Sequence, residues 1–599
     1  MYLYALSSQD IFTSKEARSA VLTLSDDDFW LTGAQVEIMR LLAGRWNEFS
    51  KEDSEALEAR LAEGIPRDLF PADAFKIQER WESIWDAAVF KRLKRVSAAG
   101  GELSAASHHI LDEISARHPS WMEEKVRQGP FGHPELLANI TDDALVKEAI
   151  RLQRERPFEG DVWRLFCSAD PDRALRALRL EADAGEWKVE AWQPLLWAAG
   201  NAGKPEFQFE LADLLARMPD EFLRELLSSA IPWLQKRRET FTANDRPGGP
   251  RFLPLWDRFA ALTYSEAGEA EVGKDDDLLV RALGEPGGML AQVLLDSLSA
   301  LKPEAGTGLG LELTPRFDRV ARAGGRAGIL GRVVLAGALA YIDGIDPVWA
   351  EENLVSRLAW SHPEAPALWK AQAVDRIGSA RLFNALRPAM LEAFEREVLS
   401  DFEFEGLVGK LLDVALWHRQ GGAGHYELPP ADIRRVLTIG PSIVRQHAAW
   451  QLRRLMGETD GLPADKAERW RTVVGPLFRD IWPLDARLRT EATSENLVLM
   501  ALRCEGAFPD AVEAIVDVVV PYQLYAMSTF LGLEQPHDML VSQHPIAFVR
   551  LANALINPAA YPVPSDLATL LQECVSADPQ IVNDPSYIRL FGLRRLRGA

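Results

Sequence analysis

Two acidic residues and a lysine form the first group in this sequence that could do chemistry. Asp172 is followed by Glu186 and Lys188, and many nucleases use an acid, acid, lysine set to hold a divalent metal for phosphoester hydrolysis. Such carboxylates normally lie on adjacent strands, whereas the apolar spacing around these residues predicts helices. We therefore favour helix caps and surface charges. A metal-dependent phosphoesterase or nuclease with a dispersed acidic site is the alternative.

Glycine-rich segments are the second group. Residues Gly268 to Lys274 have the spacing of a phosphate-binding loop, but Asp275 follows instead of serine or threonine, and no apolar strand precedes them. We interpret this segment as an acidic surface loop. Two other glycine sets do not complete a dinucleotide loop. We expect turns from the first and close helix packing from the second: Gly306, Gly308 and Gly310, then Gly324, Gly325, Gly328 and Gly331.

Neither the histidines nor the cysteines complete a metal or nucleophile motif. The ten histidines include the pair His108 and His109 and the loop residue His425, but no HExxH occurs. The cysteines at positions 167, 504 and 574 fall in apolar helical stripes, so we expect them in the core. The sequence thus predicts no catalytic residue, no cofactor and no metal site.

The net charge of the chain bears on whether nucleic acid is a partner. The chain has 599 residues, 47% hydrophobic and 26% charged, with a formal net charge of −21. Nucleic-acid binding depends on Lys and Arg that neutralise phosphates, so a nucleic-acid partner is not expected. Three short basic clusters are interpreted as solvated helix faces: Lys91, Arg92, Lys94 and Arg95; Lys236, Arg237 and Arg238; and Arg594, Arg595 and Arg597.

The sequence predicts a cytoplasmic protein. Three cysteines without a CxxC pair fit a reducing compartment, and the first residues, MYLYALSSQD, lack the regions of a signal peptide. The most apolar stretches are interrupted by charges: residues 327–341 contain Arg332, and residues 506–533 contain Asp510, Glu513 and Asp517. A spanning helix needs roughly 20 largely uncharged residues, so no membrane segment is predicted.

Apolar residues recur at helical spacing along almost the whole chain. One stripe runs from Phe207 to Met218 and a second from Leu223 to Leu234, with Pro219 and Asp220 between them, which predicts a helical hairpin. Further stripes are expected at 512–519, ending at Pro521, and at 548–556 and 567–575. Only MYLYAL alternates like a strand. We predict an all-α protein, an irregular α-solenoid of HEAT-like stacked helical hairpins, with units of roughly 35 to 50 residues.

The tryptophans are expected mainly in the core. In the helix predicted around 189–199, Trp192 shares one face with Leu195 and Leu196, while Trp197 points away from that face. We expect a second neighbouring helix to cover Trp197, because layers of helix pairs bury more than one side of each helix.

Breaks in the helical pattern suggest how the chain is divided. Segments rich in Gly, Pro and acids predict connections at 242–254, 265–277, 302–315 and 420–430. We divide the chain into an N-terminal helical region, two helical-repeat regions and a C-terminal helical region, at 1–150, 151–300, 301–425 and 426–599. A further possibility is that the chain is a fragment or split-off half of a longer protein.

The C-terminal residues resemble a known family. The text GPLFRDIWPLDARLRTEATSENLVLMALRCEGAFPDAVEAI from Gly475 onward, then HPIAFVRLANALI and DPSYIRL, is similar to the helical C-terminal regions of large prokaryotic SIR2-family (sirtuin) proteins, many associated with anti-phage defence. The resemblance covers roughly the last 120 residues. It implies a helical region that works in a defence setting.

One departure bears on enzymology. Sirtuin-like NAD hydrolysis belongs to an α/β domain with a GAG-type nucleotide loop and a catalytic histidine, and no such domain is predicted here. Gly422, Ala423, Gly424 and His425 match the tripeptide alone, because Tyr426 follows and no βα pattern surrounds it. No catalytic residue of the family is carried over.

These observations predict a non-catalytic α-helical scaffold or sensor that mediates protein–protein interaction, in a prokaryotic anti-phage defence system. A separate effector or sensor subunit is the expected partner, because stacked helical arrays present extended binding surfaces.

Overall fold

Helices account for the regular structure of the computed structural model. It describes residue 6 and residues 12–30, 35–70, 78–118, 121, 133–155, 161–201, 204–242, 251–265, 278–396, 398–419, 425–457, 461–527 and 538–593. Within these ranges there is no strand. The predicted all-α fold class is therefore confirmed. Of MYLYAL, only the buried Leu6 is described, so the strand considered there lies outside the described residues.

The chain divides into two units. Unit 1 comprises residues 1–133 and 158–161, and unit 2 comprises 134–157 and 162–599. A division at 150 would fall inside helix α8 (Leu145–Glu155), and one at 300 inside α17 (Pro286–Leu301). The stretch GPFGHP at 129–134 is the turn-rich signal for the first boundary, which the predicted region limits missed.

Unit 1 has its own hydrophobic core, to which Trp30, Leu57 and Leu93 contribute fully buried side chains. Capping side chains fix several of its helix starts; the Ser104 hydroxyl, for example, accepts a hydrogen bond from the Ser107 amide at the start of α7. Its helical elements are α2 (Ser14–Thr23), α3 (Asp26–Trp30), α4 (Gln35–Arg45), η1 (Trp46–Glu48), α5 (Lys51–Glu63), η2 (Arg67–Leu69), α6 (Gln78–Ala98) and α7 (Ala105–Arg117).

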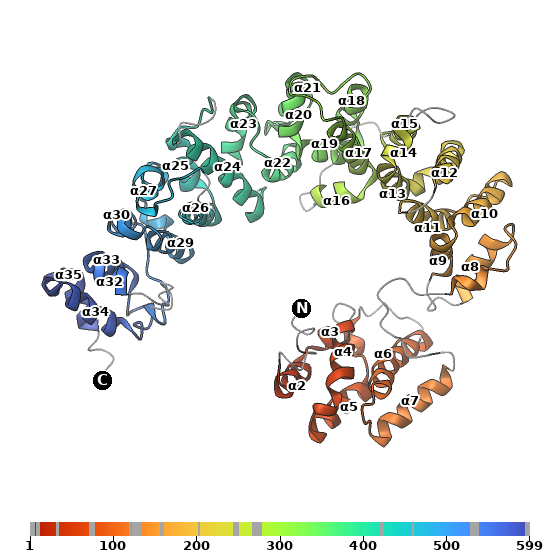
Figure 1. Ribbon diagram of the computed structural model, residues 1–599, viewed down its shortest axis with the longest axis horizontal. Coiled ribbons are helices and arrows are strands. Elements are labelled where there is room, and N and C mark those ends of the chain that lie inside the picture. Colours follow the sequence, from red (N-terminus) through yellow and green to blue (C-terminus); the bar gives the residue numbers. More distant parts are fainter. Residues whose placement is uncertain are drawn as a thin grey trace. The chain divides into compact units, whose positions relative to one another are not determined.

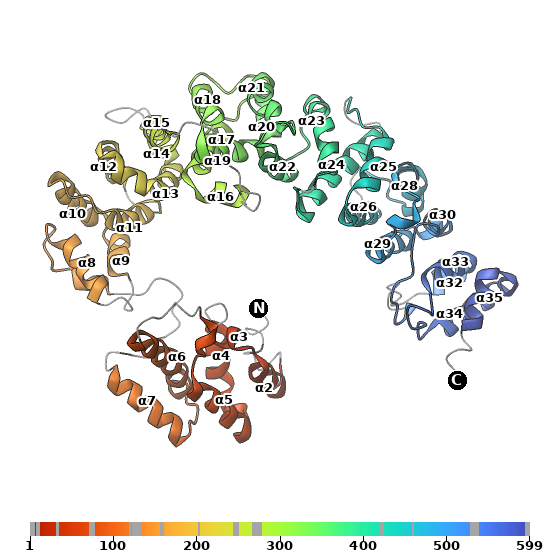
Figure 2. The ribbon, with the colours of Figure 1, turned by 180° about the vertical axis from the view of Figure 1, so that it is seen from behind.

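Unit 2 arranges most of its helices in two rows, which lie on opposite sides of the unit in Figures 1 and 2. In the first row each helix contacts the next one along the chain: α9 (Val162–Ala169), α11 (Val189–Ala199), α13 (Asp220–Lys236), α17, α19 (Gly325–Ala336), α22 (Ala365–Val374), α24 (Asp401–Arg419), α26 (Ser442–Leu455) and α29 (Glu491–Leu502). The second row alternates with it along the chain: α10 (Pro171–Asp183), α12 (Pro205–Arg217), α15 (Phe252–Thr263), α18 (Thr314–Arg322), α21 (Pro347–Asn353), α23 (Ala380–Ala393), α25 (Pro430–Ile439), α28 (Gly475–Ile481), α30 (Phe508–Ile515) and α33 (Pro545–Leu555).

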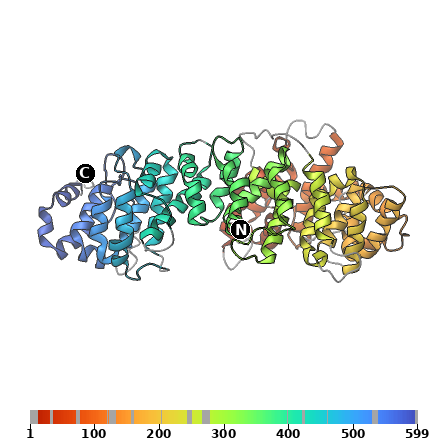
Figure 3. The same ribbon diagram turned by 90° about the horizontal axis from the view of Figure 1, so that it is seen from above.

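Shorter elements connect the rows or follow them. Seen from above in Figure 3, the helices of unit 2 lie side by side in chain order. The remaining elements are η3 (Pro134–Leu137), α8, α14 (Arg238–Thr242), α16 (Leu278–Gly284), α20 (Leu339–Ile345), η4 (Val355–Leu358), α27 (Lys466–Arg469), the π-helical η5 (Trp470–Val474), η6 (Ala486–Leu488), η7 (Glu505–Ala507), α32 (Asp538–Gln543), α34 (Leu567–Ala577), η8 (Pro579–Asn583) and α35 (Pro585–Leu593).

Polar contacts between neighbouring helix pairs recur at a similar spacing in the sequence. Arginines of the second row, and Arg471 of η5, pair with carboxylates that lie 34 to 40 residues away: Arg217 with Asp183, Arg258 with Asp220, Arg435 with Glu395, and Arg471 with Asp510. Each of these four ion pairs joins one helix pair to the pair before or after it. This spacing falls within the 35 to 50 residues expected for one unit, apart from the shortest separation.

The two helices of the predicted hairpin are present, joined by a short turn, and one helix end needs correction. The stripes from Phe207 and from Leu223 form the buried faces of α12 and α13, with Pro219 as the N-cap of α13. The stripe at 512–519 was expected to stay helical up to Pro521, but α30 ends at Ile515. Val518 and Val519 are nevertheless buried, because the turn that follows α30 packs them into the core.

The expectation for Trp197 is wrong. Its side chain on α11 is 50% exposed, and the contact that covers part of it comes from the Arg164 guanidinium, 4.4 Å from the ring centroid. Trp192 and Trp233 are fully buried, as predicted for core tryptophans. An apolar stripe shows which side of a helix is buried, but it does not show whether a neighbour covers a residue outside that stripe.

The prediction of turns at the first glycine set is confirmed, and the prediction of close helix packing is confirmed at Gly331 of the second set. Gly306, Gly308 and Gly310 adopt φ values of 75°, 82° and 83° in the turn before α18. At Gly287 and Gly331 the backbones of α17 and α19 approach closely: a Cβ on Gly287 would lie 2.3 Å from the Ala327 carbonyl oxygen.

No single described helix is both long enough and apolar enough to cross a bilayer. Two pairs meet the length and composition test only together, and each pair is sharply bent: α16 with α17 by 73°, and α19 with α20 by 74°.

Candidate functional site

The acid, acid, lysine set does not come together in the structure. Asp170 is the N-cap of α10 and Asp172 lies exposed in its first turn, whereas Glu186 follows the other end of the helix. With a rise of about 1.5 Å per residue, the two ends of α10 are on the order of 17 Å apart. Glu186 contacts the Lys188 and Lys147 amines instead, at 3.2 and 3.8 Å, and the Lys188 hydrogen bond is the main cause that lowers its pKa.

The other residues considered for chemistry are also separate. The loop from Gly268 to Lys274 and residues 421–424 lie outside the described residues. His425 is exposed, and its carbonyl accepts a hydrogen bond from Asn384. His109 lies 3.4 Å from Glu113 on the surface of α7. Across the described ranges, no group of three or more His, Cys, Asp or Glu side chains could hold a metal.

The three cysteines are buried free thiols, as predicted for core residues. Burial is the main cause that raises the pKa of the Cys574 thiol, to about 12, and burial raises that of Cys504 further. A thiol with a raised pKa is not ionised near neutral pH, so neither group can act as a nucleophile there.

Unit 1 contains a histidine–carboxylate pair that the sequence did not single out. His118 Nε2 lies 2.8 Å from the buried Asp86 carboxylate, which Arg117 also contacts at 2.7 Å. The imidazole stacks on Trp121, with ring centroids 3.7 Å apart and an interplanar angle of 5°. The stacked indole covers one face of the imidazole ring. We therefore interpret the pair as a contact that holds the end of α7 in place, and not as an accessible general base.

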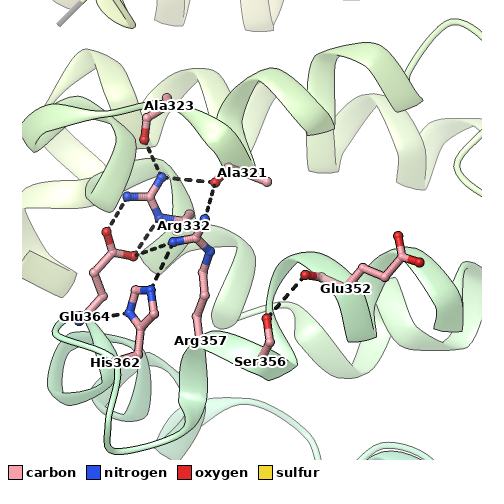
Figure 4. Close-up of polar contacts among 8 residues, drawn as sticks. All are labelled: Ala321, Ala323, Arg332, Glu352, Ser356, Arg357, His362 and Glu364. Carbon is pink, nitrogen blue, oxygen red and sulfur yellow. Dashed lines mark hydrogen bonds and ion pairs between the residues drawn. The ribbon is translucent and has the colours of Figure 1, made fainter. Parts of the chain in front are cut away.

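A buried ionic cluster lies between α19 and the segment that leads into α22 (Figure 4). Arg332, 3% exposed, donates from Nε to Glu364 at 2.7 Å, and from Nη1 to the carbonyls of Ala321 and Ala323 at 3.2 and 2.6 Å. Arg357 adds a second guanidinium, 3.7 Å from Glu364. Burial, and next the Arg332 charge, lower the pKa of Arg357. The cluster joins α18, α19 and α22.

The Ala321 and Ala323 carbonyls, to which Arg332 donates, lie at the end of α18. Similar contacts between a polar side chain and the last carbonyls of a helix recur along unit 2. The last carbonyls of a helix have no partner within that helix, and cations are favoured there. Side chains from elsewhere in the chain meet them: Arg237 at Ala199, Arg258 at Met218, Gln372 at Ala336, Lys410 at Gln372, Arg445 at Gly440, Arg469 at Met456, Arg434 at Asp480, and Arg589 at Ile556.

Two of these hydrogen bonds connect three consecutive first-row helices, α19, α22 and α24. The Gln372 amide on α22 donates to Ala336 at the end of α19, 36 residues earlier, at 2.8 Å. The Gln372 carbonyl in turn accepts a hydrogen bond from the Lys410 amine on α24, 38 residues later. Lys410 is 6% exposed, and burial lowers its pKa to about 8 against the opposing effect of Asp375. Polar residues inside apolar helices thus join successive first-row helices of unit 2.

One first-row surface combines an exposed tryptophan with the exposed Arg503 and two half-buried arginines. Trp450 on α26 is 39% exposed, and the Arg454 guanidinium lies 5.7 Å from its ring centroid. Arg453 donates to the Asn496 side chain on α29 at 3.0 Å, and Arg503 donates to the Arg453 carbonyl at 3.2 Å. We call Trp450, Arg453, Arg454, Asn496 and Arg503 the α26 face.

Sequence reasoning missed the buried cations and the α26 face for different reasons. Arg332, Gln372 and Lys410 interrupt apolar helical stripes, which is a visible signal for a buried polar contact but does not identify the partner. The α26 face draws on two helices that are some 40 residues apart in the sequence, so no local motif contains it.

Comparisons with known proteins leave the family open. The chain is similar to an uncharacterized protein, y4cA, of Sinorhizobium fredii, with 23% identity over 612 aligned positions that cover 98% of this chain and 49% of that protein. The chain therefore spans about half the length of the curated relative that it matches. No protein-family model and no solved structure matches the chain. The resemblance of the C-terminal region to sirtuin-family proteins stays a prediction.

Proposed function

We propose that the chain is a non-catalytic α-helical scaffold or sensor that binds another protein, and that unit 2 works as an irregular α-solenoid. The observation that carries this proposal is the use of the buried polar side chains. Arg332 contacts the Glu364 carboxylate, and Gln372 and Lys410 contact carbonyls at the ends of neighbouring helices, so these buried groups stabilise the array. An array in which each unit contacts its neighbours presents a long surface suited to a protein partner.

The setting that we propose is prokaryotic anti-phage defence, in the cytoplasm. The similarity of residues from Gly475 onward to the tails of sirtuin-family defence proteins supports the first part. Three buried free thiols are compatible with a reducing compartment, which supports the second. In the curated relative the matched half is joined to about as much chain again, so in that protein the matched region carries further polypeptide.

The phosphoesterase alternative gains no support from the geometry, because Asp172 and Glu186 lie at opposite ends of α10. Its test is incubation of the purified protein with DNA, RNA, nucleotides and NAD. Activity that is lost on chelation and in Asp172→Asn or Glu186→Gln would replace our proposal.

The scaffold proposal is tested by co-purification from the native host, with and without phage infection, followed by quantitative mass spectrometry. We expect one or a few proteins to be enriched in a stable ratio to the chain. A chain that is recovered alone under both conditions would refute the scaffold role.

A further inference from the structure

Exposed ion pairs connect successive helices of the second row in unit 2. An arginine in or beside one second-row helix contacts a carboxylate of the next or the previous one: Arg179 with Glu210 at 2.8 Å, Arg251 with Asp213 at 2.9 Å, Arg316 with Asp257 at 2.6 Å, Arg381 with Glu351 at 3.0 Å, and Arg387 with Asp432 at 3.5 Å. The carboxylate side chains of these pairs are 30 to 62% exposed, so dissolved ions reach them.

The first row is joined by contacts of a different kind. Trp163 on α9 donates from Nε1 to the Ala191 carbonyl on α11 at 2.8 Å, and both residues are buried. Further along the chain, the buried Gln372 joins α22 to α19, and the buried Lys410 joins α24 to α22. Salt screens buried polar contacts much less than exposed ones, so these junctions are insensitive to the ionic strength.

Salt therefore acts unequally on the two rows. The Debye length falls from about 30 Å at 0.01 M ionic strength to about 3 Å at 1 M, which weakens the attraction within an exposed pair. One exposed pair contributes little to stability, so it can break without unfolding the helices that it joins. A junction that loses its second-row ion pair and keeps its first-row contacts is free to open on the second-row side.

We infer that the second-row ion pairs are a salt-sensitive restraint on the angle between successive helix pairs, and that unit 2 opens along its second row when these pairs are screened. This rests on the stacked array that we propose for unit 2 and adds a way in which its shape is controlled. The surface that the first row offers to a partner changes with the angle, because neighbouring first-row helices form that surface together.

The junction between α18 and α21 differs from its neighbours. Trp349 on α21 donates from Nε1 to the Asp318 carboxylate on α18 at 2.8 Å, and its ring packs against Phe317 with centroids 5.6 Å apart. The indole carries no charge and Trp349 is buried, so salt weakens this contact less than an exposed ion pair. The salt-sensitive junctions therefore lie on both sides of it, from α10 to α18 and from α21 to α25.

Distances between spin labels on the full chain, measured by double electron–electron resonance, test this inference. The second-row label pair uses Ala216→Cys on α12 and Ala385→Cys on α23, and the first-row pair uses Ser228→Cys on α13 and Val374→Cys on α22; all four positions are exposed. The native thiols are buried. Between about 0.01 M and about 1 M salt, we expect the second-row distance to increase and the first-row distance to stay constant.

A variant with neutral side chains assigns this shift to the ion pairs. The three substitutions remove the pairs that lie between the second-row labels: Asp213→Asn, Asp257→Asn and Glu351→Gln. We expect its second-row distance at low salt to match the wild-type distance at high salt, with most of the salt-dependent shift lost.

The matched control also removes three carboxylates, each of which pairs with a cation of its own helix: Glu55→Gln, Glu148→Gln and Glu392→Gln. It should shift with salt like the wild type. Unchanged circular-dichroism spectra at both salt concentrations would show that all variants stay folded.

The inference is overturned if the second-row distance in the wild type does not increase with salt. Equal shifts in both label pairs, or a full shift in the neutralised variant, would also reject it. Low-salt distances that disagree with the structure would refute the array itself and this inference with it. Failure of the scaffold proposal is distinguishable, because it leaves the chain without a co-purifying protein whatever the labels show.

Discussion

At the scale of single residues, this protein places charged groups in its core and pairs them with carbonyls and carboxylates. Breaking such a buried pair on one side leaves an uncompensated charge, whereas replacing both partners by apolar residues removes the cost of burying either. The sequence shows the interruption of an apolar stretch by Arg332, and that signal was interpreted as evidence against a membrane span. It could not identify Glu364, because the two residues are 32 positions apart and meet only after α19 and α22 pack.

The Arg332–Glu364 pair gives the first prediction. We expect Glu364→Gln to lower the free energy of unfolding by about 3 to 5 kcal/mol, because Arg332 stays buried without its counter-charge. The double variant Arg332→Met with Glu364→Leu should recover most of that loss. Chemical denaturation of the three proteins measures both effects.

The control for this prediction is Glu427→Gln, which removes an exposed carboxylate 3.8 Å from Arg387. An exposed pair contributes less than about 1 kcal/mol, so this variant should be close to the wild type. Equal losses in Glu364→Gln and Glu427→Gln would contradict our account of the cluster.

Lys410 gives the second prediction, which concerns pH. Its pKa is about 8 in the folded protein and 10.5 as its ordinary value, so between these pH values the unfolded chain binds more protons than the folded one. The stability of the wild type relative to Lys410→Met should therefore rise as pH increases from 8 to 10.5. The full change is about 3 kcal/mol, since one pKa unit corresponds to about 1.4 kcal/mol.

Denaturation at a series of pH values, with each variant measured beside the wild type, checks this sign. Lys466→Met is the control, because Lys466 is half-exposed and pairs with Glu505 at 2.7 Å. A Lys410→Met difference that is constant with pH, or that shifts in the opposite direction, would show that Lys410 is not held in a desolvated site.

At the scale of helices, apolar periodicity predicted the buried faces well and the contacts between helices poorly. The stripes in α12, α13, α33 and α34 are buried as expected, because the spacing of apolar residues within a helix determines which of its sides faces the core. The end of α30 was misplaced, because Val518 and Val519 continue the apolar pattern into a turn. Whether Trp197 is covered depends on its neighbours, which the pattern does not identify.

The close approach of α17 and α19 gives the third prediction. We expect Gly287→Ala to destabilise the protein by about 1 to 3 kcal/mol, because its Cβ would lie 2.3 Å from a backbone oxygen that cannot move freely. Gly344→Ala in α20, where a Cβ meets nothing within 4 Å, should be neutral or stabilising by up to about 1 kcal/mol. Thermal melts of both variants make the comparison. A neutral Gly287→Ala would mean that the two helices are not closely packed.

At the scale of the whole molecule, the sequence predicted helices throughout and missed the division into units. Helical spacing recurs everywhere, so it carries no signal at a boundary, and the turn-rich GPFGHP stretch was the available clue. The α26 face likewise forms only when helices that are distant in the sequence pack together. It arises where α26 and α29 bring Arg453 and Arg503 together, which residue spacing alone does not reveal.

The central claim is that first-row helices of unit 2 hold a protein partner. It is tested most directly by replacing Gln451, beside Trp450 on α26, with the photocrosslinking amino acid p-benzoylphenylalanine in the native host. The same replacement at Arg479 on α28 is the control. We predict a covalent adduct with a distinct protein from position 451 and none from position 479. Irradiation that gives no adduct from position 451, or the same adducts from both positions, would contradict the claim.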